Sequence, residues 1–342
     1  MSRCWPMLCL LVVSAACLPL VPVPSASPAV GLPVRTASPT PFLPAPASPS
    51  PLPTSTPSPT PLPSSTPKPL VPDFTYIIFI AFENKEYGKI IGNADMPNYN
   101  RFAQEYTLLN QHYAVIHPSL PNYLAMMGGD TFGVTSNCED CFINARSLPD
   151  EIEASGRTWK TYQESMPKPC FIGSRDKYAQ KHNPFIYFDP IRLDAARCER
   201  SIVPLTQLDA DQAANALPNF SFIMPNLCNS AHDSDCPLYV ADTWLGKLMN
   251  KLLPVLDASG KPYLVVLTWD EGQTKDSCCG LPAEAGGRIP TVLVSPQVKN
   301  GFQDETPYTL YSLLKTVAKA WGLAYLGRAV DFNNALILAP WK

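Results

Sequence analysis

The distribution of proline divides this chain into two parts that cannot fold in the same way. Just over half of the 39 prolines lie before Asp73, where they alternate with Ser, Thr, Ala, Leu and Val in a segment with almost no charge or glycine. A proline ring every two or three residues removes backbone donors and fixes φ, so this segment cannot build a hydrogen-bonded core. We predict a disordered stalk over residues 18–72 and a folded domain over residues 73–342.

The first residues of the chain predict export. One positive charge precedes the apolar run Met7–Ala16, which is too short to span a bilayer. We interpret residues 1–17 as a secretory signal peptide. Two ways of processing stay open: lipid attachment at Cys17, which follows small residues as in a lipoprotein cleavage box, and ordinary cleavage near Ala16 or Ala26. We therefore expect a protein that is secreted or anchored at the extracellular face of the membrane.

Size and charge narrow the class of protein. Roughly 270 residues remain from Asp73 onward, which suits one large α/β domain with a sizeable core. The net charge is −3, and no run of basic residues occurs anywhere in the chain. Because binding to a phosphate backbone depends on clustered Lys and Arg, we expect no nucleic-acid partner. We expect the domain to be a monomer.

The cysteines agree with export. Beyond the signal region their number is even, which in an exported domain favours disulfides. The alternative for Cys138 and Cys141 is half of a zinc site, but no second pair with matching spacing exists, since Cys278 and Cys279 are adjacent. The pairing cannot be deduced from the sequence. These eight cysteines are Cys138, Cys141, Cys170, Cys198, Cys228, Cys236, Cys278 and Cys279.

Hydrophobic periodicity predicts the scaffold. Tyr76–Phe82 is a continuous apolar run with the composition of a strand that is buried on both faces, and Tyr263–Trp269 is a further buried strand. Strands are also predicted over Phe220–Met224 and Arg288–Val294. Helices are predicted between and after them, over Met96–Glu105, Ser147–Gly156, Val240–Leu256 and Tyr308–Trp321. Strands that alternate with helices in this order predict an α/β fold with a mostly parallel central sheet flanked by helices on both faces.

Polar residues follow three of these strands directly. They are Glu83, Asn84, Asn226, Asp270 and Glu271. In open α/β sheets the ligand crevice lies at the carboxyl ends of the strands, so we expect these side chains to converge. Carboxylate and carbonyl oxygens suit one divalent metal ion, whose identity stays open among calcium, magnesium, manganese, iron and zinc. A solvated turn is the alternative interpretation of Asp270-Glu271.

One compact string supplies a candidate nucleophile. In His117-Pro118-Ser119-Leu120-Pro121-Asn122-Tyr123 a serine lies between two prolines, with a histidine before it and an amide after it. Alone, the string is typical of a proline-rich turn. Together with the acids at the strand ends, it predicts that Ser119 completes the metal shell and attacks phosphorus, because coordination lowers the pKa of a hydroxyl.

The four histidines differ in their surroundings. His232 lies beside Asp233, an acid that is close enough in sequence to orient its ring for proton transfer. His117 depends on Ser119, and His182 follows Lys181 in a short polar segment. No motif includes His112, which we interpret as structural or surface-exposed.

These motifs together resemble the bacterial phosphoesterase family, which includes secreted acid phosphatases and phospholipases C and belongs to the alkaline phosphatase superfamily. The resemblance extends from Tyr76 to Leu323. It is carried by Phe82-Glu83-Asn84, the Ser119 string, Lys181-His182-Asn183-Pro184-Phe185, Pro225-Asn226-Leu227-Cys228-Asn229 with Ala231-His232-Asp233, and Thr268-Trp269-Asp270-Glu271-Gly272.

The resemblance implies an alkaline-phosphatase-like fold and a set of roles. The metal ligands would be Glu83, Asn84, Ser119, Asp270 and Glu271, and the proton donors and acceptors would be His117, His182 and His232. Asn122, Lys181 and Asp233 would bind the substrate, with the Asn122 amide donating to a phosphate oxygen. The chain departs from the family pattern at Glu271, where a second aspartate is usual, and at Leu310, where a histidine often occurs.

We therefore predict a metal-dependent acid phosphatase that hydrolyses phosphate monoesters through a phosphoserine. Two alternatives stay open: a phosphodiesterase of the phospholipase C type, which would use the same core, and a noncatalytic surface adhesin. The alcohol part of the substrate is not readable from the sequence.

Overall fold

A computed structural model describes residues 70–342, which fall within one compact unit, Ser65–Lys342. The predicted signal peptide, Cys17 and most of the predicted stalk lie outside the described residues. Among the helices that are described, none is both long and apolar enough to cross a membrane.

One sheet forms the centre of the described domain. Its strands are β1 (Tyr76–Phe82), β2 (Thr107–Tyr113), β3 (Trp159–Gln163), β4 (Ile202–Pro204), β5 (Phe220–Met224), β6 (Tyr263–Trp269), β7 (Arg288–Val294), β8 (Gln303–Asp304) and β9 (Tyr308–Thr309). The order is β4-β3-β5-β1-β6-β7-β2-β8, and β9 also pairs with β2. Every pair is parallel except the two that β7 makes, with β6 and with β2. The predicted mostly parallel sheet is confirmed.

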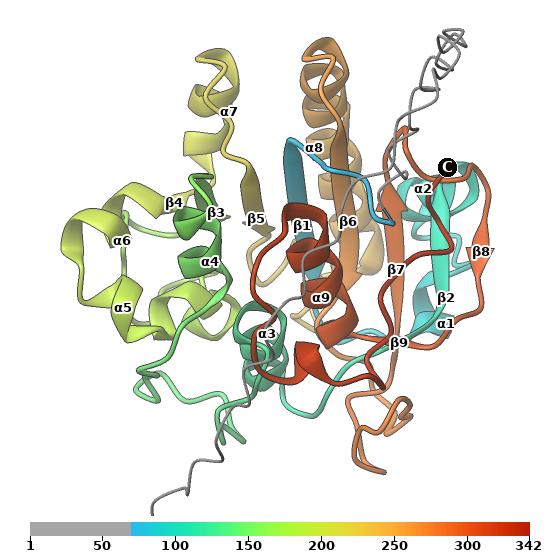
Figure 1. The fold of residues 1–342 in the computed structure, drawn as a ribbon, viewed down its shortest axis with the longest axis horizontal. Coiled ribbons are helices and arrows are strands. Elements are labelled where there is room, and N and C mark those ends of the chain that lie inside the picture. The colour runs from blue at the N-terminus through green and yellow to red at the C-terminus, as the bar shows by residue number, and fades with distance from the viewer. Residues whose placement is uncertain (1–69) are drawn as a thin grey trace, which may run out of the picture. The chain divides into compact units, whose positions relative to one another are not determined.

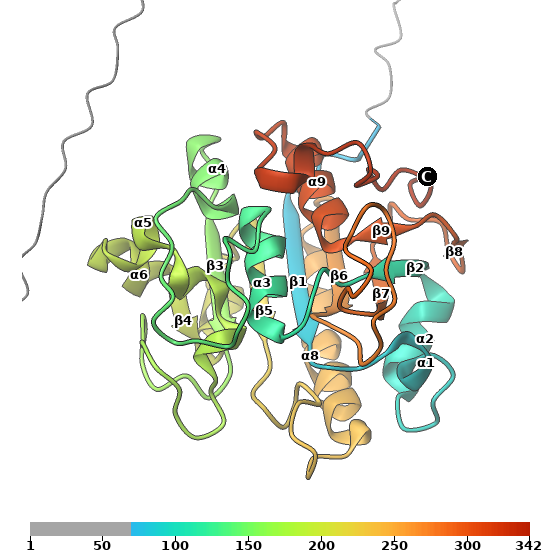
Figure 2. The same cartoon turned by 90° about the horizontal axis from the view of Figure 1, so that it is seen from below.

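Helices cover both faces of this sheet. They are α1 (Tyr87–Ile90), α2 (Pro97–Glu105), α3 (Ser119–Gly128), α4 (Leu148–Ala154), α5 (Asp189–Arg192), α6 (Ala195–Ser201), α7 (Thr206–Ala213), α8 (Leu238–Ala258) and α9 (Leu310–Trp321), with 3₁₀ turns at Gln180–His182, Pro184–Tyr187 and Gly327–Val330. Helices α3 and α9 lie on one face, and α2 and α8 lie on the other (Figure 1 and Figure 2).

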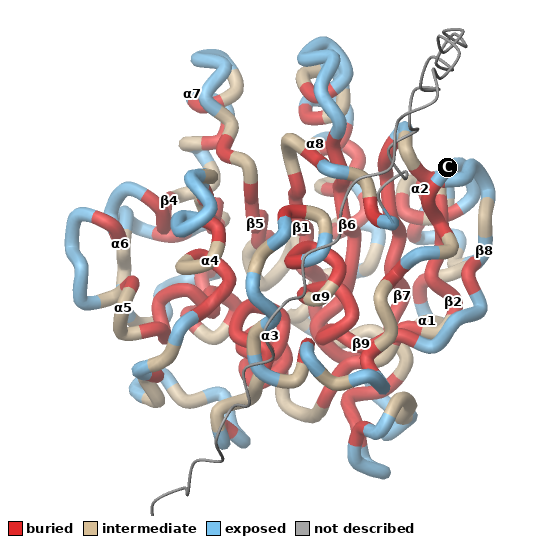
Figure 3. The backbone as a smooth tube through the Cα atoms, in the orientation of Figure 1, coloured by how far each residue is buried: buried red, intermediate tan, exposed pale blue. Residues whose placement is uncertain are grey.

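The core lies along the central strands (Figure 3). Every residue of β6 is buried, and in β1 only Tyr76 is partly exposed. Both strands are continuous apolar runs because helices pack on each side of them, which leaves no face for polar residues. The apolar run stops abruptly at Phe82 in β1 and at Trp269 in β6, and these two residues are register partners. The pairing of β1 with β6 thus places the polar residues that follow Phe82 beside those that follow Trp269.

The sequence prediction is wrong or incomplete in several elements. The Ser119 string is the start of helix α3 rather than a turn. Pro121 fits there because the first turn of a helix has no intrahelical partner for its backbone N–H groups. Strands β2, β3 and β4 are not predicted, and the helix expected from Tyr308 begins two residues later, after the short strand β9. Strand β2 contains polar Asn110, Gln111 and His112, which interrupt its apolar pattern.

All eight cysteines of the described domain form disulfides. The pairs are Cys138–Cys141, Cys170–Cys198, Cys228–Cys236 and Cys278–Cys279. The zinc alternative for Cys138 and Cys141 is therefore wrong, since both sulfurs are used in one bond.

Candidate active site

The acids converge because β1 and β6 are neighbours in the sheet. Glu83 and Asn84 continue β1, while Asp270 and Glu271 continue β6. The backbone N–H of Asp270 still donates to Phe82 O at 3.0 Å, and the backbone N–H of Asn84 donates to Asp270 Oδ1, also at 3.0 Å. Asn84 has φ 56°, a left-handed conformation that is uncommon for a residue with a side chain. The chain therefore turns sharply at this point and directs both strand ends to one place.

Helix α3 brings the candidate nucleophile to these acids. Ser119 is its first residue and is buried. The Ser119 Oγ lies 3.2 Å from Glu83 Oε2, 3.1 Å from Glu271 Oε1 and 3.5 Å from Asn84 Oδ1. The structure thus brings together the residues that were predicted as metal ligands, from two strand ends and one helix start.

Burial of three acids in one place has a strong electrostatic effect. Burial raises the pKa of Glu83 to about 7, although the hydrogen bond from Tyr123 and the charge of Lys181 act in the opposite direction. Burial and the charge of Glu83 raise the pKa of Asp270 well above its ordinary value. Asp270 Oδ2 is buried and has no hydrogen-bond partner. A buried carboxylate oxygen without a partner is costly unless a cation neutralises it.

A divalent cation fits this donor set. Carboxylate, amide and hydroxyl oxygens around one point are the ligands that hard divalent ions prefer. Glu83, Asn84, Asp270, Glu271 and Ser119 would hold such an ion, and the unpartnered Asp270 Oδ2 is the oxygen that most requires it.

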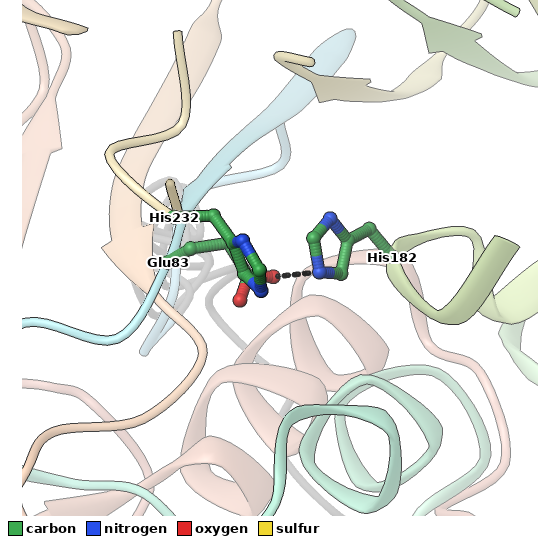
Figure 4. Close-up of side chains that lie close together, drawn as sticks. All are labelled: Glu83, His182 and His232. Atoms are coloured by element: carbon green, nitrogen blue, oxygen red, sulfur yellow. Dashed lines mark ion pairs between the residues drawn. The ribbon is translucent and has the colours of Figure 1, made fainter. Parts of the chain in front are cut away.

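The second oxygen of Glu83 faces a different group of side chains. Glu83 Oε1 accepts a hydrogen bond from the Tyr123 hydroxyl and lies 3.0 Å from His182 Nε2, although His182 Nε2 is not aligned for a hydrogen bond. Figure 4 shows Glu83 with His182 and His232. Burial and the charge of Lys181 hold the pKa of His182 well below its ordinary value, so this ring is neutral.

A chain of contacts orients His232. Its Nδ1 lies 3.0 Å from Asp233 Oδ1, and its Nε2 lies 3.0 Å from Lys181 Nζ. Asp233 Oδ2 in turn accepts a hydrogen bond from Lys177 at 2.7 Å. Burial lowers the pKa of His232, and the hydrogen bond to Asp233 acts against that shift. We expected Asp233 to contact the substrate, but the structure places it behind His232, as the acid that fixes the ring.

The loop that carries His232 is fixed at several points. The Cys228–Cys236 disulfide closes it, and Ser230 O accepts a hydrogen bond from the Glu83 backbone at 2.9 Å. Asn226 does not reach the acids, since its Oδ1 accepts from the backbone N–H groups of Cys228 and Asn229. The predicted convergence of Asn226 with Glu83 and Asp270 is therefore wrong.

His117 is held at both ring nitrogens. Its Nδ1 lies 2.5 Å from Glu271 Oε2, and its Nε2 lies 2.8 Å from Thr274 O. The hydrogen bond to Glu271 raises the pKa of His117. With both nitrogens engaged, His117 positions Glu271 rather than facing a substrate.

The side chain of Asn122 forms hydrogen bonds with nearby backbone groups. Its Nδ2 donates to Ile116 O at 2.6 Å and to Pro118 O at 3.1 Å, while its Oδ1 accepts from the N–H groups of Val115 and Ile116. Both amide hydrogens are used, so the expected hydrogen bond to a phosphate oxygen is corrected here. Asn122 fixes the turn that precedes Ser119.

Sequence reasoning missed three residues around the site. Tyr123, four residues after Ser119 on α3, donates to Glu83. Lys85 donates to Ala231 O at 2.7 Å, and burial lowers the pKa of its ammonium group, against the charges of Glu83 and Asp270. Glu86 accepts hydrogen bonds from the backbone of Gln273, Thr274 and Arg288 and thereby holds the loop after Glu271. Lys85 and Glu86 directly follow Glu83-Asn84 in the sequence, and this position could have marked them as residues near the site.

The packing of Glu86 favours glycine at the start of that loop. A Cβ atom on Gly272 would lie 2.2 Å from Glu86 Oε2, a distance that real Cβ atoms do not show. Gly272 therefore allows Glu86 to approach the backbone that carries Glu271.

Comparison with known proteins identifies relatives over most of this domain. The sequence profile of the Phosphoesterase family matches residues 77–324. A phosphate-repressible acid phosphatase from Penicillium chrysogenum is 35% identical over 244 residues, which cover 68% of this chain and 56% of that protein. A phosphatidylinositol-3-phosphatase from Mycobacterium tuberculosis is 30% identical over 265 residues, which cover 76% of this chain and 81% of that protein. The chain thus spans little more than half of the fungal relative.

Solved structures share the fold at low sequence identity. A protein in the alkaline phosphatase superfamily from Vibrio parahaemolyticus has a TM-score of 0.51 and 13% identity, with 77% of this chain and 71% of that chain covered. The lipoteichoic acid synthase LtaP from Listeria monocytogenes has a TM-score of 0.52 and 13% identity, with coverage of 77% and 76%. These matches establish an alkaline-phosphatase-like fold.

Proposed function

Because the chain belongs to the Phosphoesterase family, we propose that it is a metal-dependent acid phosphatase. It would hydrolyse phosphate monoesters through a phosphoserine formed at Ser119, in a domain that is secreted or displayed outside the cell. The family and the two phosphatases to which the chain is similar support the reaction class. The four disulfides of the described domain agree with an oxidising compartment.

One observation carries the proposal: Ser119 Oγ lies within 3.5 Å of Glu83, Asn84 and Glu271 at the start of a helix. A serine whose hydroxyl meets two buried carboxylates has acceptors for its proton. A helix N-terminus also favours a negative charge, such as that of a phosphate group on the serine. A structural serine in a turn would not require this arrangement of acids.

In the first step, transfer of the phosphoryl group to Ser119, different residues accept and donate the protons. The Ser119 hydroxyl gives its proton to a neighbouring carboxylate, the bond from Oγ to phosphorus forms, and the bond from phosphorus to the alcohol oxygen breaks. A divalent ion bound by the acids would supply positive charge to Ser119 and to a phosphate oxygen. The departing oxygen takes a proton from the pair of Lys181 and His232, whose polar atoms are 3.0 Å apart.

The second step restores the enzyme. A water molecule attacks the phosphoserine, the bond from Oγ to phosphorus breaks, and phosphate leaves while Ser119 regains its proton. His232 is the base for this water, because Asp233 fixes its ring and leaves Nε2 directed toward Lys181 and the Glu83 side of the site.

The decisive experiment compares the wild-type protein with Ser119→Ala on p-nitrophenyl phosphate. We expect activity to fall by at least about 10⁴-fold, because the nucleophile is lost. Acid quenching of the wild-type reaction followed by mass spectrometry is expected to detect phosphate on Ser119. Unchanged activity in Ser119→Ala would reject the mechanism. A parallel assay on phosphatidylcholine separates monoester hydrolysis from phospholipase C activity.

A further inference from the structure

Asn137 lies beside the residue that follows the nucleophile. Its Oδ1 accepts a hydrogen bond from the backbone N–H of Leu120 at 3.0 Å, and Leu120 directly follows Ser119 in helix α3. Because a backbone N–H can only donate, the atom that faces Leu120 must be the amide oxygen. The Nδ2 atom therefore keeps both of its hydrogens, and no described residue accepts a hydrogen bond from it. Asn137 is exposed, so its NH₂ group is open to a ligand.

The start of α3 offers few donors of its own to a phosphoryl group on Ser119. Pro121 has no backbone N–H, and the N–H of Leu120 already donates to Asn137. Both hydrogens of the Asn122 amide are donated to backbone carbonyl groups. The non-bridging oxygens of a transferred phosphoryl group carry negative charge, which fixed donors stabilise. The NH₂ group of Asn137 is a side-chain donor at this end of the helix that no described residue uses.

The loop that carries Asn137 is fixed to a neighbouring part of the site. The Cys138–Cys141 disulfide closes the turn directly after Asn137. Cys138 O accepts a hydrogen bond from the Tyr187 hydroxyl at 2.8 Å. Tyr187 ends the 3₁₀ turn that follows the one with His182. A donor on a loop that is fixed in this way needs little reorganisation to meet a developing charge.

We infer that Asn137 binds a non-bridging oxygen of the transferred phosphoryl group through Nδ2, the role predicted for Asn122 from the sequence. This assignment rests on the proposed function, because it places the phosphoryl group on Ser119. The donor acts in both steps, the attack by Ser119 on phosphorus and the attack by water on the phosphoserine. Asn137 gives up no proton in either step, and its amide stays neutral.

Asn137→Asp separates phosphate binding from a purely structural role. The carboxylate keeps an oxygen for the Leu120 N–H, and a negative charge is favourable at a helix N-terminus, so the unfolding temperature should match that of the wild type. The same substitution removes the NH₂ donor and brings a charge that repels phosphate. On p-nitrophenyl phosphate we expect kcat/KM to fall by about 10²-fold in Asn137→Ala and by more in Asn137→Asp. The opposite order, with Asn137→Asp close to the wild type, would show that Asn137 only caps Leu120 and would overturn the inference.

Titration with inorganic phosphate gives a readout that does not depend on turnover. Calorimetry on the full-length protein should show binding weaker by about 10-fold in Asn137→Ala and by about 10²-fold in Asn137→Asp. Ser136→Asp is the matched control, since it adds the same charge one residue away on an exposed position. It should bind phosphate within about threefold of the wild type, because solvent and salt screen an exposed charge. The metal content should be equal in all four proteins.

The outcomes separate this inference from the proposed function. Equal phosphate binding in the wild type and in Asn137→Asp would overturn the inference, and so would a wild-type protein that binds no phosphate. An equal loss in Ser136→Asp would also overturn it, because the effect would then be one of charge alone. Weaker binding in Asn137→Asp, together with full activity in Ser119→Ala, would support the phosphate contact of Asn137 and reject the phosphoserine of the proposed function.

Discussion

The two oxygens of the Glu83 carboxylate face two unlike halves of the site. Oε2 faces the acid half, where Ser119 and Asn84 lie within 3.2 Å. Oε1 faces the base half, where His182 lies at 3.0 Å and where the Lys181–His232 pair follows. The acid half has an excess of negative charge and a buried oxygen of Asp270 without a partner, whereas the base half has a neutral buried imidazole and an ammonium group.

The difference shows how the two oxygens of one carboxylate can serve both a site for a bound cation and the histidine side of the site. In the acid half the missing charge is positive and must come from a bound ion, because no described lysine or arginine contacts Ser119, Asp270 or Glu271 through a hydrogen bond. In the base half the positive charge is part of the chain. We therefore expect variants of Glu83 to disturb both halves, and variants of the residues behind each half to disturb only one.

Glu83→Gln should have the largest effect. The substitution keeps the shape of the side chain but removes the charge that both halves share, so we expect activity to fall by about 10³-fold and metal affinity to fall with it. The metal-free variant should unfold at a higher temperature than the metal-free wild type at pH 8, because it buries one negative charge fewer beside Asp270 and Glu271. Phosphatase assays, metal titration and thermal unfolding measure these effects. A variant that loses activity but binds metal normally would break the comparison.

Asp233→Asn should affect the base half alone. The amide oxygen of the variant lacks the full negative charge with which Asp233 accepts a hydrogen bond from His232 Nδ1–H, so it holds the ring less firmly. We therefore expect about 10²-fold lower kcat on p-nitrophenyl phosphate with an unchanged affinity for metal. The part of the pH dependence of kcat that follows His232 should shift to lower pH, because the charge of Asp233 supports the protonated form of His232. Equal loss of metal affinity would show that the halves are not separate. Lys177→Met, which removes only the partner behind Asp233, should have a smaller effect.

His117→Gln should affect the acid half alone. His117 orients Glu271 through a contact at 2.5 Å. Loss of an outer partner of a metal ligand typically lowers metal affinity by 10- to 100-fold, and we expect about 10-fold here because the ring is partly exposed. Activity at saturating metal should be close to that of the wild type. A loss of activity that added metal does not restore would instead indicate direct participation of His117 in the reaction.

His112 provides a test of acid sensitivity outside the site. Its ring is fully buried against Thr291, and burial lowers its pKa from 6.5 to about 4. The unfolded chain binds a proton here below pH 6.5, but the folded chain does so only below about 4. The stability that depends on the neutral ring is therefore complete above pH 6.5 and is lost as the pH falls toward 4, by about 3 kcal/mol.

The matching experiment compares unfolding by urea at pH 7 and pH 4.5. In His112→Gln this part of the pH dependence should be absent, while the activity of the folded protein stays near that of the wild type. An identical loss of stability in both proteins would assign the acid sensitivity to the carboxylates and histidines of the site.

The sequence allowed prediction of the strands at the centre of the sheet. Strands β1, β5, β6 and β7 are rich in apolar residues, and their predicted bounds agree with the structure. Strand β3 contains Lys160 and depends on its pairing with β4 and β5, so local pattern could not reveal it. Helix α3 was missed because all ten of its residues are buried, polar Ser119 and Asn122 included, so its sequence has no exposed polar face and no amphipathic periodicity.

The sequence allowed prediction of which residues form the candidate site, but not of where all their side chains point. Glu83, Asp270 and Ser119 meet because strand ends and a helix start meet, which follows from topology. Asn122 and Asp233 were expected to face the substrate, yet Asn122 is hydrogen-bonded to nearby backbone groups and Asp233 to His232 and Lys177. A motif specifies which groups are present, but the hydrogen-bond partners of each group decide where it points.

The close approach of Gly272 to Glu86 affects how mutational screens of this protein should be interpreted. In a saturation library scored by enzymatic activity, we expect substitutions at position 272 to lower the score, because a Cβ atom would displace the Glu86 carboxylate from the N–H groups of Gln273 and Thr274. The score would match that of a residue that contacts the substrate. A parallel screen for protein abundance, combined with libraries that vary positions 86 and 272 together, would distinguish steric intolerance from chemistry.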